Sequence, residues 1–255
     1  MNKFCLVTLF STLVVSVQVS AQPIEPLNTL GGSKVSRQCL PLDSAHLKAQ
    51  YQVTNAKGQN WSMTLLRDGQ DFIIQRDATS FELWSANGEY VRYFPKEKRS
   101  VTYRRGDLLA LNIQHDREQL YHLVSPTLTK RMHKTLLKHD GCFDAQGYAG
   151  KVNGVESELN WIEGIALPKQ FTLGEVTNFQ LQYKLVSVEP FDAKAFAALT
   201  QHYQDIDFAD VGDSESDPFI AKMINQGFIE HGSSGFYSSE GHAIGSQNDH
   251  GSHVH

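Results

Sequence analysis

The sequence predicts an α+β protein built on an antiparallel half-barrel sheet that is covered by helices. Through residues 61–103, large apolar residues alternate with polar ones, and Asp68 with Gly69 and Asn87 with Gly88 form turn signals between short strands. Helical spacing replaces this alternation within residues 107–140 and again near the C-terminus, while strand alternation returns at 147–189. A meander, a helical interruption and further strands together describe an incomplete barrel.

Residues 1–21 have the layout of a secretory signal peptide. One lysine precedes an apolar run, and the small residue Ala21 ends a cleavage signal before Gln22. The run is shorter than the roughly 20 residues that a spanning helix needs, although a retained N-terminal anchor is an alternative. We therefore expect a periplasmic protein. Its net charge of −5 and its scattered Lys and Arg make nucleic acid an unsuitable partner.

Two cysteines, Cys39 and Cys142, remain after the signal peptide. In an oxidising compartment they most simply form one disulfide. Such a bond closes a long loop and would stabilise the fold by roughly 4–5 kcal/mol in the chain-entropy model. Two unpaired thiols are the alternative.

The pattern divides the chain into five parts. Residues 22–45 are predicted to be a flexible lead-in, and residues 46–204 the half-barrel domain. Residues 205–227 are predicted to form an acidic linker with a short helix, and residues 228–255 a Gly-, Ser- and His-rich flexible tail.

Strands are predicted wherever apolar and polar residues alternate. The first set covers residues 46–54 and the short stretches of alternating residues within 61–103. The second set covers residues 148–152, 157–162, 169–173 and 176–188.

Helices are predicted at four places. Leu120, Leu123 and Val124 have helical spacing up to Pro126. A second helix is predicted to begin with Ser125 as N-cap and Pro126 at its first position, and to end at Gly141. Its apolar stripe is Leu128, Met132, Leu136 and Leu137. Its other face carries Lys130, Arg131, Lys134 and Lys138. Asp192 caps a third helix with Ala195, Phe196, Leu199 and Tyr203 on one face, and Asp217 caps a fourth with Ile220, Met223 and Ile224 inward and Gly227 at its end.

Four segments resemble the LolA/LolB-like periplasmic lipoprotein-carrier superfamily, over roughly residues 46–196. They are LKAQYQVTN, LLRDGQDFIIQ, LWSANGEYVRYFPKEKRSVTY and LNWIEGIALPKQFTLGEVTNFQLQYKLVSVEPFDAKAF. The chain departs from the family at Asp68, where a proline is expected after Arg67, and it continues beyond the usual endpoint. The resemblance implies a concave half-barrel, lidded by helices, whose apolar lining accepts acyl chains or an amphipathic partner.

The candidate ligand-binding residues are mainly the aromatic side chains of the meander. They are Trp61, Phe72, Phe81, Trp84, Tyr93 and Tyr103, although ordinary core is the favoured interpretation of each one taken singly. By the resemblance, Arg67 would match the family's turn arginine and hold the helical lid or a ligand headgroup. An exposed turn arginine is the alternative.

Two stretches could hold a metal ion. Histidines are concentrated near the C-terminus, and His242, His250, His253 and His255, with His231 before them, could bind Zn or Cu, or form a merely solvated tail. The acidic run at 205–217 holds Asp205, Asp207, Asp210, Asp213, Glu215 and Asp217. It fails the register of an EF-hand, so a solvated linker is the better interpretation.

Known catalytic motifs are missing from the sequence, including the nucleophile elbow, the His-Glu-x-x-His zinc motif and the phosphate-binding loop. His115 and His122 could share a helical face but have no obvious partner at metal spacing. The leading hypothesis is a non-enzymatic periplasmic carrier or chaperone that binds a lipid, a lipoprotein or another hydrophobic ligand and requires no cofactor. An envelope protein is a further candidate partner. The alternatives are an envelope metal-binding protein and an interaction scaffold.

Overall fold

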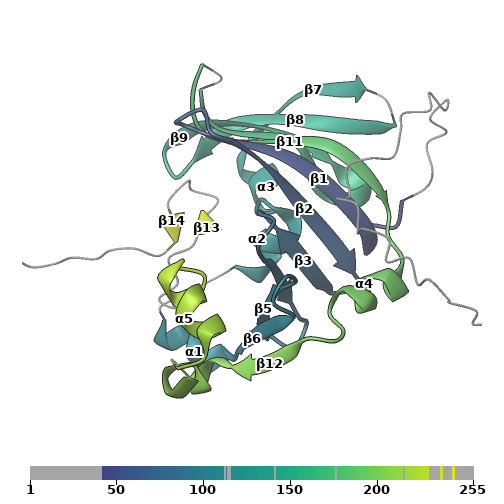
Figure 1. Ribbon diagram of the computed structural model, residues 1–255. Helices are drawn as coiled ribbons and strands as arrows, with labels where there is room; N and C mark the ends of the chain where they lie inside the picture. The colour runs from purple at the N-terminus through teal and green to yellow at the C-terminus, as the bar shows by residue number, and fades with distance from the viewer. Residues whose placement is uncertain are drawn as a thin grey trace, which may run out of the picture. The chain divides into compact units, whose positions relative to one another are not determined.

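The computed structural model describes residues 42–111, 113, 116–140, 142–175, 177–214, 216–229, 236–237 and 243–244 (Figure 1). The predicted signal peptide, nearly all of the predicted lead-in and most of the predicted tail lie outside these residues. No helix among the described residues is long and apolar enough to cross a membrane.

The predicted meander is confirmed. It consists of β1 (His46–Asn55), β2 (Asn60–Asp68), β3 (Asp71–Gln75), β4 (Phe81–Trp84), β5 (Tyr90–Phe94) and β6 (Arg99–Tyr103). Consecutive strands pair antiparallel, so that Ala49 lies opposite Leu65 and Leu83 opposite Val91. Gly69 and Gly88 take positive φ angles of 63° and 88° at the two predicted turns, a conformation that glycine adopts without steric cost.

Three short helices follow the meander, namely α1 (Arg105–Ala110), α2 (Arg117–His122) and α3 (Leu128–Arg131). One predicted helix is wrong in most of its length. Residues His133–Asp140, predicted to continue a helix to Gly141, form the strand β7. Leu136 is 81% exposed, so the supposed apolar stripe does not continue on a buried face. Pairing with the next strand satisfies the backbone groups on one edge of this segment, and tertiary context outweighs its weak helical pattern.

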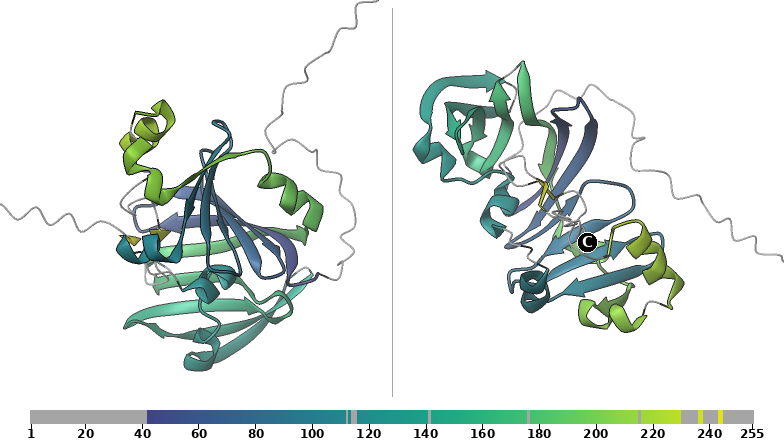
Figure 2. Two further views of the ribbon diagram at one scale, coloured as in Figure 1. Left: turned by 90° about the horizontal axis from the view of Figure 1, so that it is seen from below. Right: turned by 90° about the vertical axis from the view of Figure 1, so that its left-hand side faces the viewer.

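The second strand set completes a single sheet. It comprises β8 (Phe143–Val152), β9 (Val155–Ile162), β10 (Leu167–Glu175) and β11 (Asn178–Pro190), with the 3₁₀ turn η1 (Glu163–Ile165) between β9 and β10. The strand order is β12-β6-β5-β4-β3-β2-β1-β11-β10-β9-β8-β7, and β11 pairs with β1 to join the two sets. The result is one large, strongly curved, mainly antiparallel sheet, the coarse form of the predicted half-barrel (Figure 2).

The C-terminal part of the described chain returns to the sheet. It comprises α4 (Ala193–Leu199), β12 (Gln204–Asp207), the 3₁₀ turns η2 (Phe208–Asp210) and η3 (Gly212–Ser214), α5 (Pro218–Asn225), and the two-residue strands β13 (Phe236–Tyr237) and β14 (Ala243–Ile244). The Asp192 and Asp217 caps are confirmed, because each carboxylate accepts a backbone N–H of its helix. Tyr203 lies beyond the end of α4 rather than within it.

The segment predicted as an acidic linker begins as a strand of the sheet. β12 pairs parallel to β6. Asp205 Oδ1 accepts hydrogen bonds from Ser100 Oγ at 2.6 Å and Thr102 Oγ1 at 3.0 Å. Asp207 Oδ2 lies 2.8 Å from Arg104 Nε. These carboxylates are therefore bound to β6, which the local sequence alone does not reveal.

The sheet carries a core on each face. The larger core covers the concave face, where α1–α3 and α5 contribute Leu108, Leu123, Leu128, Ile220 and Met223. The smaller core lies on the convex face, where Phe196 of α4 packs on β2–β5 (Figure 1).

The strand alternation divides the predicted aromatic surface between these two cores. Phe72, Trp84 and Tyr103 are buried in the concave core, whereas Phe81 and Tyr93 are buried in the convex core. Phe81 and Tyr93 stack with ring centroids 4.8 Å apart, and Tyr203 meets both rings edge-on. The six aromatic residues therefore do not share one face.

Arg67 lies at the centre of the molecule and is 0% exposed. Its guanidinium donates to four main-chain oxygens: Ser44 O at 3.0 Å, Tyr121 O at 2.6 Å from Nη2 and 3.1 Å from Nε, Ile165 O at 2.9 Å and Ala166 O at 3.2 Å. These five bonds use all five N–H groups of an arginine.

Arg67 thereby connects three separate segments of the chain. Its Cζ also lies 4.0 Å from the centre of the Tyr121 ring. Burial lowers the pKa of Arg67 to about 10, which leaves the group charged at neutral pH. The side chain is therefore no exposed turn arginine. It holds the C-terminal end of α2 against the sheet.

Replacing Arg67 should strongly destabilise the protein. In the variant Arg67→Met, four carbonyls lose a charged donor, and we expect the free energy of unfolding to fall by at least about 3 kcal/mol. Urea denaturation followed by circular dichroism measures this change. The variant Arg104→Met is the matched control, because its side chain is 72% exposed, and it should leave the midpoint nearly unchanged. Equal midpoints for both variants would contradict the assignment of Arg67.

His122, beside Arg67, should make stability depend on pH. Its Nδ1 donates to Ala166 O at 2.8 Å. Burial, helped by the charge of Arg67 and opposed by the Ala166 hydrogen bond, lowers the pKa of His122 below its ordinary value. The folded state thus binds this proton less tightly than the unfolded chain, so protonation favours unfolding, and stability is lost as the pH falls below about 6.5.

The variant His122→Gln isolates this contribution. Compared with the wild type, its free energy of unfolding should fall less between pH 7 and pH 5, as measured by urea titrations at both values. His133→Gln, at an exposed position on β7, should retain the wild-type pH dependence. An unchanged slope in His122→Gln would show that this imidazole does not titrate as expected.

Candidate functional site

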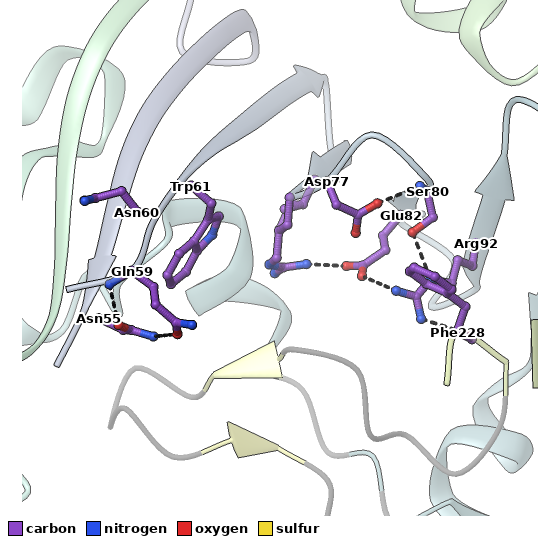
Figure 3. A pocket seen from close by; sticks show the side chains of 11 residues that line it. Asn55, Gln59, Asn60, Trp61, Asp77, Ser80, Glu82, Arg92 and Phe228 are labelled. Carbon is purple, nitrogen blue, oxygen red and sulfur yellow. Dashed lines mark hydrogen bonds and ion pairs between the residues drawn. The ribbon is translucent and has the colours of Figure 1, made fainter. Parts of the chain in front are cut away.

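A pocket of about 430 Å³ opens on the concave side of the meander (Figure 3). The turn between β1 and β2, strands β3–β5 and the chain after α5 contribute its walls. Its lining residues are Asn55, Gln59, Asn60, Trp61, Ile74, Arg76, Asp77, Ser80, Glu82, Arg92 and Phe228.

Strand register places the charged residues of the pocket on one face. Ile74 of β3 lies opposite Glu82 of β4, and Glu82 lies opposite Arg92 of β5. Side chains of directly paired residues point to the same side of a sheet. Their sequence neighbours Phe81 and Tyr93 consequently point to the convex core.

Glu82 connects two arginines in a mostly buried ion network. Its Oε2 lies 2.6 Å from Arg76 Nη1, and its Oε1 lies 3.7 Å from Arg92 Nη2. The side chains of Glu82 and Arg92 are only 6% and 7% exposed. Burial opposes the charge on Arg92, but nearby Tyr90 and Glu82 outweigh it, so the pKa of Arg92 lies above its ordinary value.

Arg92 also fixes the segment that follows α5. Its Nη1 donates to Phe228 O at 2.8 Å, and its Cζ lies 5.3 Å from the Phe228 ring centre. Gly227, with a φ of 70°, lets the chain turn out of α5 so that Phe228 N donates to Met223 O at 2.9 Å. The Phe228 ring meets Phe94 edge-on at 6.2 Å. Phe228 is thus anchored at the pocket by contacts with β5.

The other end of the pocket combines amides with Trp61. Asn55 Oδ1 accepts from the backbone N–H groups of Lys57 and Gln59 at 3.0 and 3.1 Å, and Asn55 Nδ2 donates to Gln59 Oε1 at 2.7 Å. These bonds order the β1–β2 turn beside the half-buried indole of Trp61. The pocket therefore presents an aromatic and amide end and a charged end.

Of the predicted ligand-binding residues, the structure places only Trp61 at this pocket. Phe72, Trp84 and Tyr103 are core, Phe81 and Tyr93 lie on the opposite face, and the donors of Arg67 are used by main-chain oxygens. Sequence reasoning missed the charged end. The available signal was a charge within each of the strands FELW and YVRYF, at Glu82 and Arg92.

The metal and disulfide predictions remain mostly outside the described residues. His115, His231, His242, His250, His253 and His255 are not described, and the described residues contain no group of three side chains suited to hold a metal ion. Zinc or copper binding by the tail thus stays a prediction. Cys142 is disulfide-bonded, and because Cys39 is not described, the pairing of these two cysteines also stays a prediction.

Removing the central carboxylate should destabilise the protein. In Glu82→Gln, Arg76 and the buried Arg92 lose their shared counter-charge. We therefore expect the free energy of unfolding to fall by roughly 3 kcal/mol. Chemical denaturation measures the change. Glu189→Gln is the matched control, because it also removes a carboxylate from an ion pair but from one whose glutamate is 58% exposed. A loss in Glu82→Gln no greater than in the control would refute the buried network.

Comparisons with known proteins give only weak matches. No family model and no curated protein matches the chain. The structure of PNGF-II in space group P21 matches with a TM-score of 0.37 and 11% identity, over 66% of this chain and 32% of that chain.

Two further solved structures are similar to the same limited degree. The crystal structure of MucB matches with a TM-score of 0.37 and 11% identity, over 63% of this chain and 59% of that chain. The Pseudomonas aeruginosa MucA/MucB complex matches with a TM-score of 0.35 and 9% identity, over 59% and 54%. This chain spans less than two thirds of the length of each match. The comparisons therefore assign no family to the chain.

Proposed function

We propose that this protein is an exported, non-enzymatic binding protein that holds an amphipathic ligand, a lipid or the acylated part of a lipoprotein, in the concave pocket. Export is inferred from the signal-peptide pattern of residues 1–21. The single observation that carries the binding role is the pocket, which joins an aromatic and amide end to a buried ion network.

The size and lining of the pocket favour a ligand of mixed polarity. Its volume of about 430 Å³ falls within the range of roughly 300–1,000 Å³ typical of small-molecule sites. Trp61, Ile74 and Phe228 offer apolar surface, while Arg76, at 21% side-chain exposure, is the more accessible of the two arginines. We infer that the apolar part of a ligand packs on Trp61 and that its polar head meets the charged end.

The filled core limits how much of the ligand is enclosed. Side chains from α1–α3 and α5 pack on the apolar concave wall, and Phe72, Trp84 and Tyr103 are part of that core. The proposal therefore differs from the expected acyl-lined barrel. It places the head and the adjoining part of one chain in the pocket.

Binding should be visible through Trp61. The other two tryptophans, Trp84 and Trp161, are 5% and 3% exposed, whereas Trp61 is half-buried at the pocket. Titration with a lysophospholipid below its micelle concentration should shift the fluorescence emission to the blue and saturate. In Trp61→Phe the shift should disappear, while native mass spectrometry still detects the bound lipid.

Truncating the indole should weaken binding. Trp61→Ala removes apolar contact area, and we expect roughly tenfold weaker lysophospholipid binding by native mass spectrometry. Phe179→Ala, at a half-buried aromatic position on β11 that does not line the pocket, is the matched control and should bind as the wild type does. Absence of any bound lipid in the wild type, both as purified and after titration, would refute the proposal.

A further inference from the structure

β7 is the last strand on one side of the sheet (Figure 1). One of its edges pairs with β8, from His133 opposite Ala149 to Asp140 opposite Phe143. Within the described part of the chain, no strand pairs with its other edge. An unpaired edge presents backbone N–H and C=O groups that can pair with another extended segment.

The side chains of β7 are unusual for a strand. Every side chain from 133 to 139 is exposed, and Leu136 and Leu137 are 81% and 47% exposed. β7 carries Lys134 and Lys138 and ends at Asp140, and α3 before it adds Lys130 and Arg131. The edge is thus basic and carries accessible apolar side chains.

A second cavity lies beside this strand. It has a volume of about 490 Å³, and Lys134 and Leu137 of β7 line it together with Phe143, Ile162 and the two carboxylates Asp144 and Glu163. When a strand is added to a sheet edge, main-chain hydrogen bonds supply affinity, and pockets for alternate side chains supply specificity. β7 offers both features.

The other end of the same sheet shows how this molecule completes an edge. There, the acidic strand β12 pairs with β6, Asp205 binds hydroxyl groups of β6, and Asp207 binds the guanidinium of Arg104 directly after β6. β7 presents the corresponding chemistry, with lysines and the hydroxyl-bearing Thr135 on an edge. Its complement is therefore an acidic extended segment.

We propose that β7 is a docking edge for an acidic, extended segment of another protein, which pairs with it as an added strand. A second copy of this chain is a poor occupant, because two β7 strands would bring lysines against lysines. The bulge between Lys134 and Leu137 puts these two residues on the cavity face of β7 and Lys138 on the other face. Carboxylates of the added strand would face Lys138, and its apolar side chains would lie on the face of Leu137 and the cavity. The proposal does not depend on the concave pocket or its ligand.

The test uses a fluorescein-labelled peptide that alternates aspartate and valine and is about as long as β7, titrated into the full-length protein at low salt with fluorescence anisotropy as readout. We expect saturable binding that weakens as salt rises. The variant Lys134→Glu/Lys138→Glu should bind roughly tenfold more weakly and should gain binding to the peptide with lysine in place of aspartate. The matched control Lys57→Glu/Lys96→Glu changes two exposed turn lysines and should bind the acidic peptide as the wild type does.

A second probe separates strand addition from simple charge attraction. The same acidic peptide with alternate backbone amides N-methylated keeps its charge but cannot complete a β-ladder, and we expect its binding to be lost. Equal binding of the methylated peptide would overturn the proposal, as would unchanged binding by Lys134→Glu/Lys138→Glu or no binding by the wild type. A dimer in light scattering that the β7 variant abolishes would also overturn it, since the edge would then serve a second copy.

Discussion

The fold depends on one buried cation. Arg67 of β2 donates all five of its N–H groups to main-chain oxygens at the entry to β1, at the end of α2 and at the turn between β9 and β10. A carbonyl buried without a hydrogen-bond donor costs free energy, and a charged donor forms the strongest hydrogen bond to it. Because these segments belong to different parts of the chain, Arg67 ties the meander, the helical interruption and the second strand set together. The resemblance implied that Arg67 holds the helical lid or a ligand headgroup, and in the structure its donors are used by main-chain oxygens, including that of Tyr121 in α2.

The candidate site arises from the alternation of side chains between the two faces of each strand. Along β4 and β5, neighbouring residues point to opposite faces, so that Glu82 and Arg92 meet on the concave side while Phe81 and Tyr93 pack under α4. A single-residue slip in register would exchange the two sets and put the ion network under α4. The convex core therefore fixes the register that creates the pocket, and this gives α4 a role in the site although it does not line it.

The two edge strands of the sheet, β6 with its partner β12 at one end and β7 at the other, differ in what covers them. β6 is covered by an acidic strand from the same chain, whose carboxylates bind hydroxyl groups of β6 and the guanidinium of Arg104 directly after it. β7 carries lysines, which discourage self-association of a free edge, yet it also exposes Leu136 and borders a cavity. Discouraging identical partners while favouring acidic ones requires only one set of positive charges.

Sequence by itself determined the meander, its Gly69 and Gly88 turns, the second strand set and the capped helices at Asp192 and Asp217. Each of these rests on local rules, namely two-residue alternation, positive φ at glycine and side-chain capping. Tertiary structure alone decided that residues 133–140 pair with β8, that Asp205 and Asp207 bind β6, and which face each aromatic residue occupies. It also decided that Arg67 is buried and that Glu82 lies between two arginines. These features are contacts between residues far apart in the chain, and no local pattern specifies the partner of a strand or of a charge.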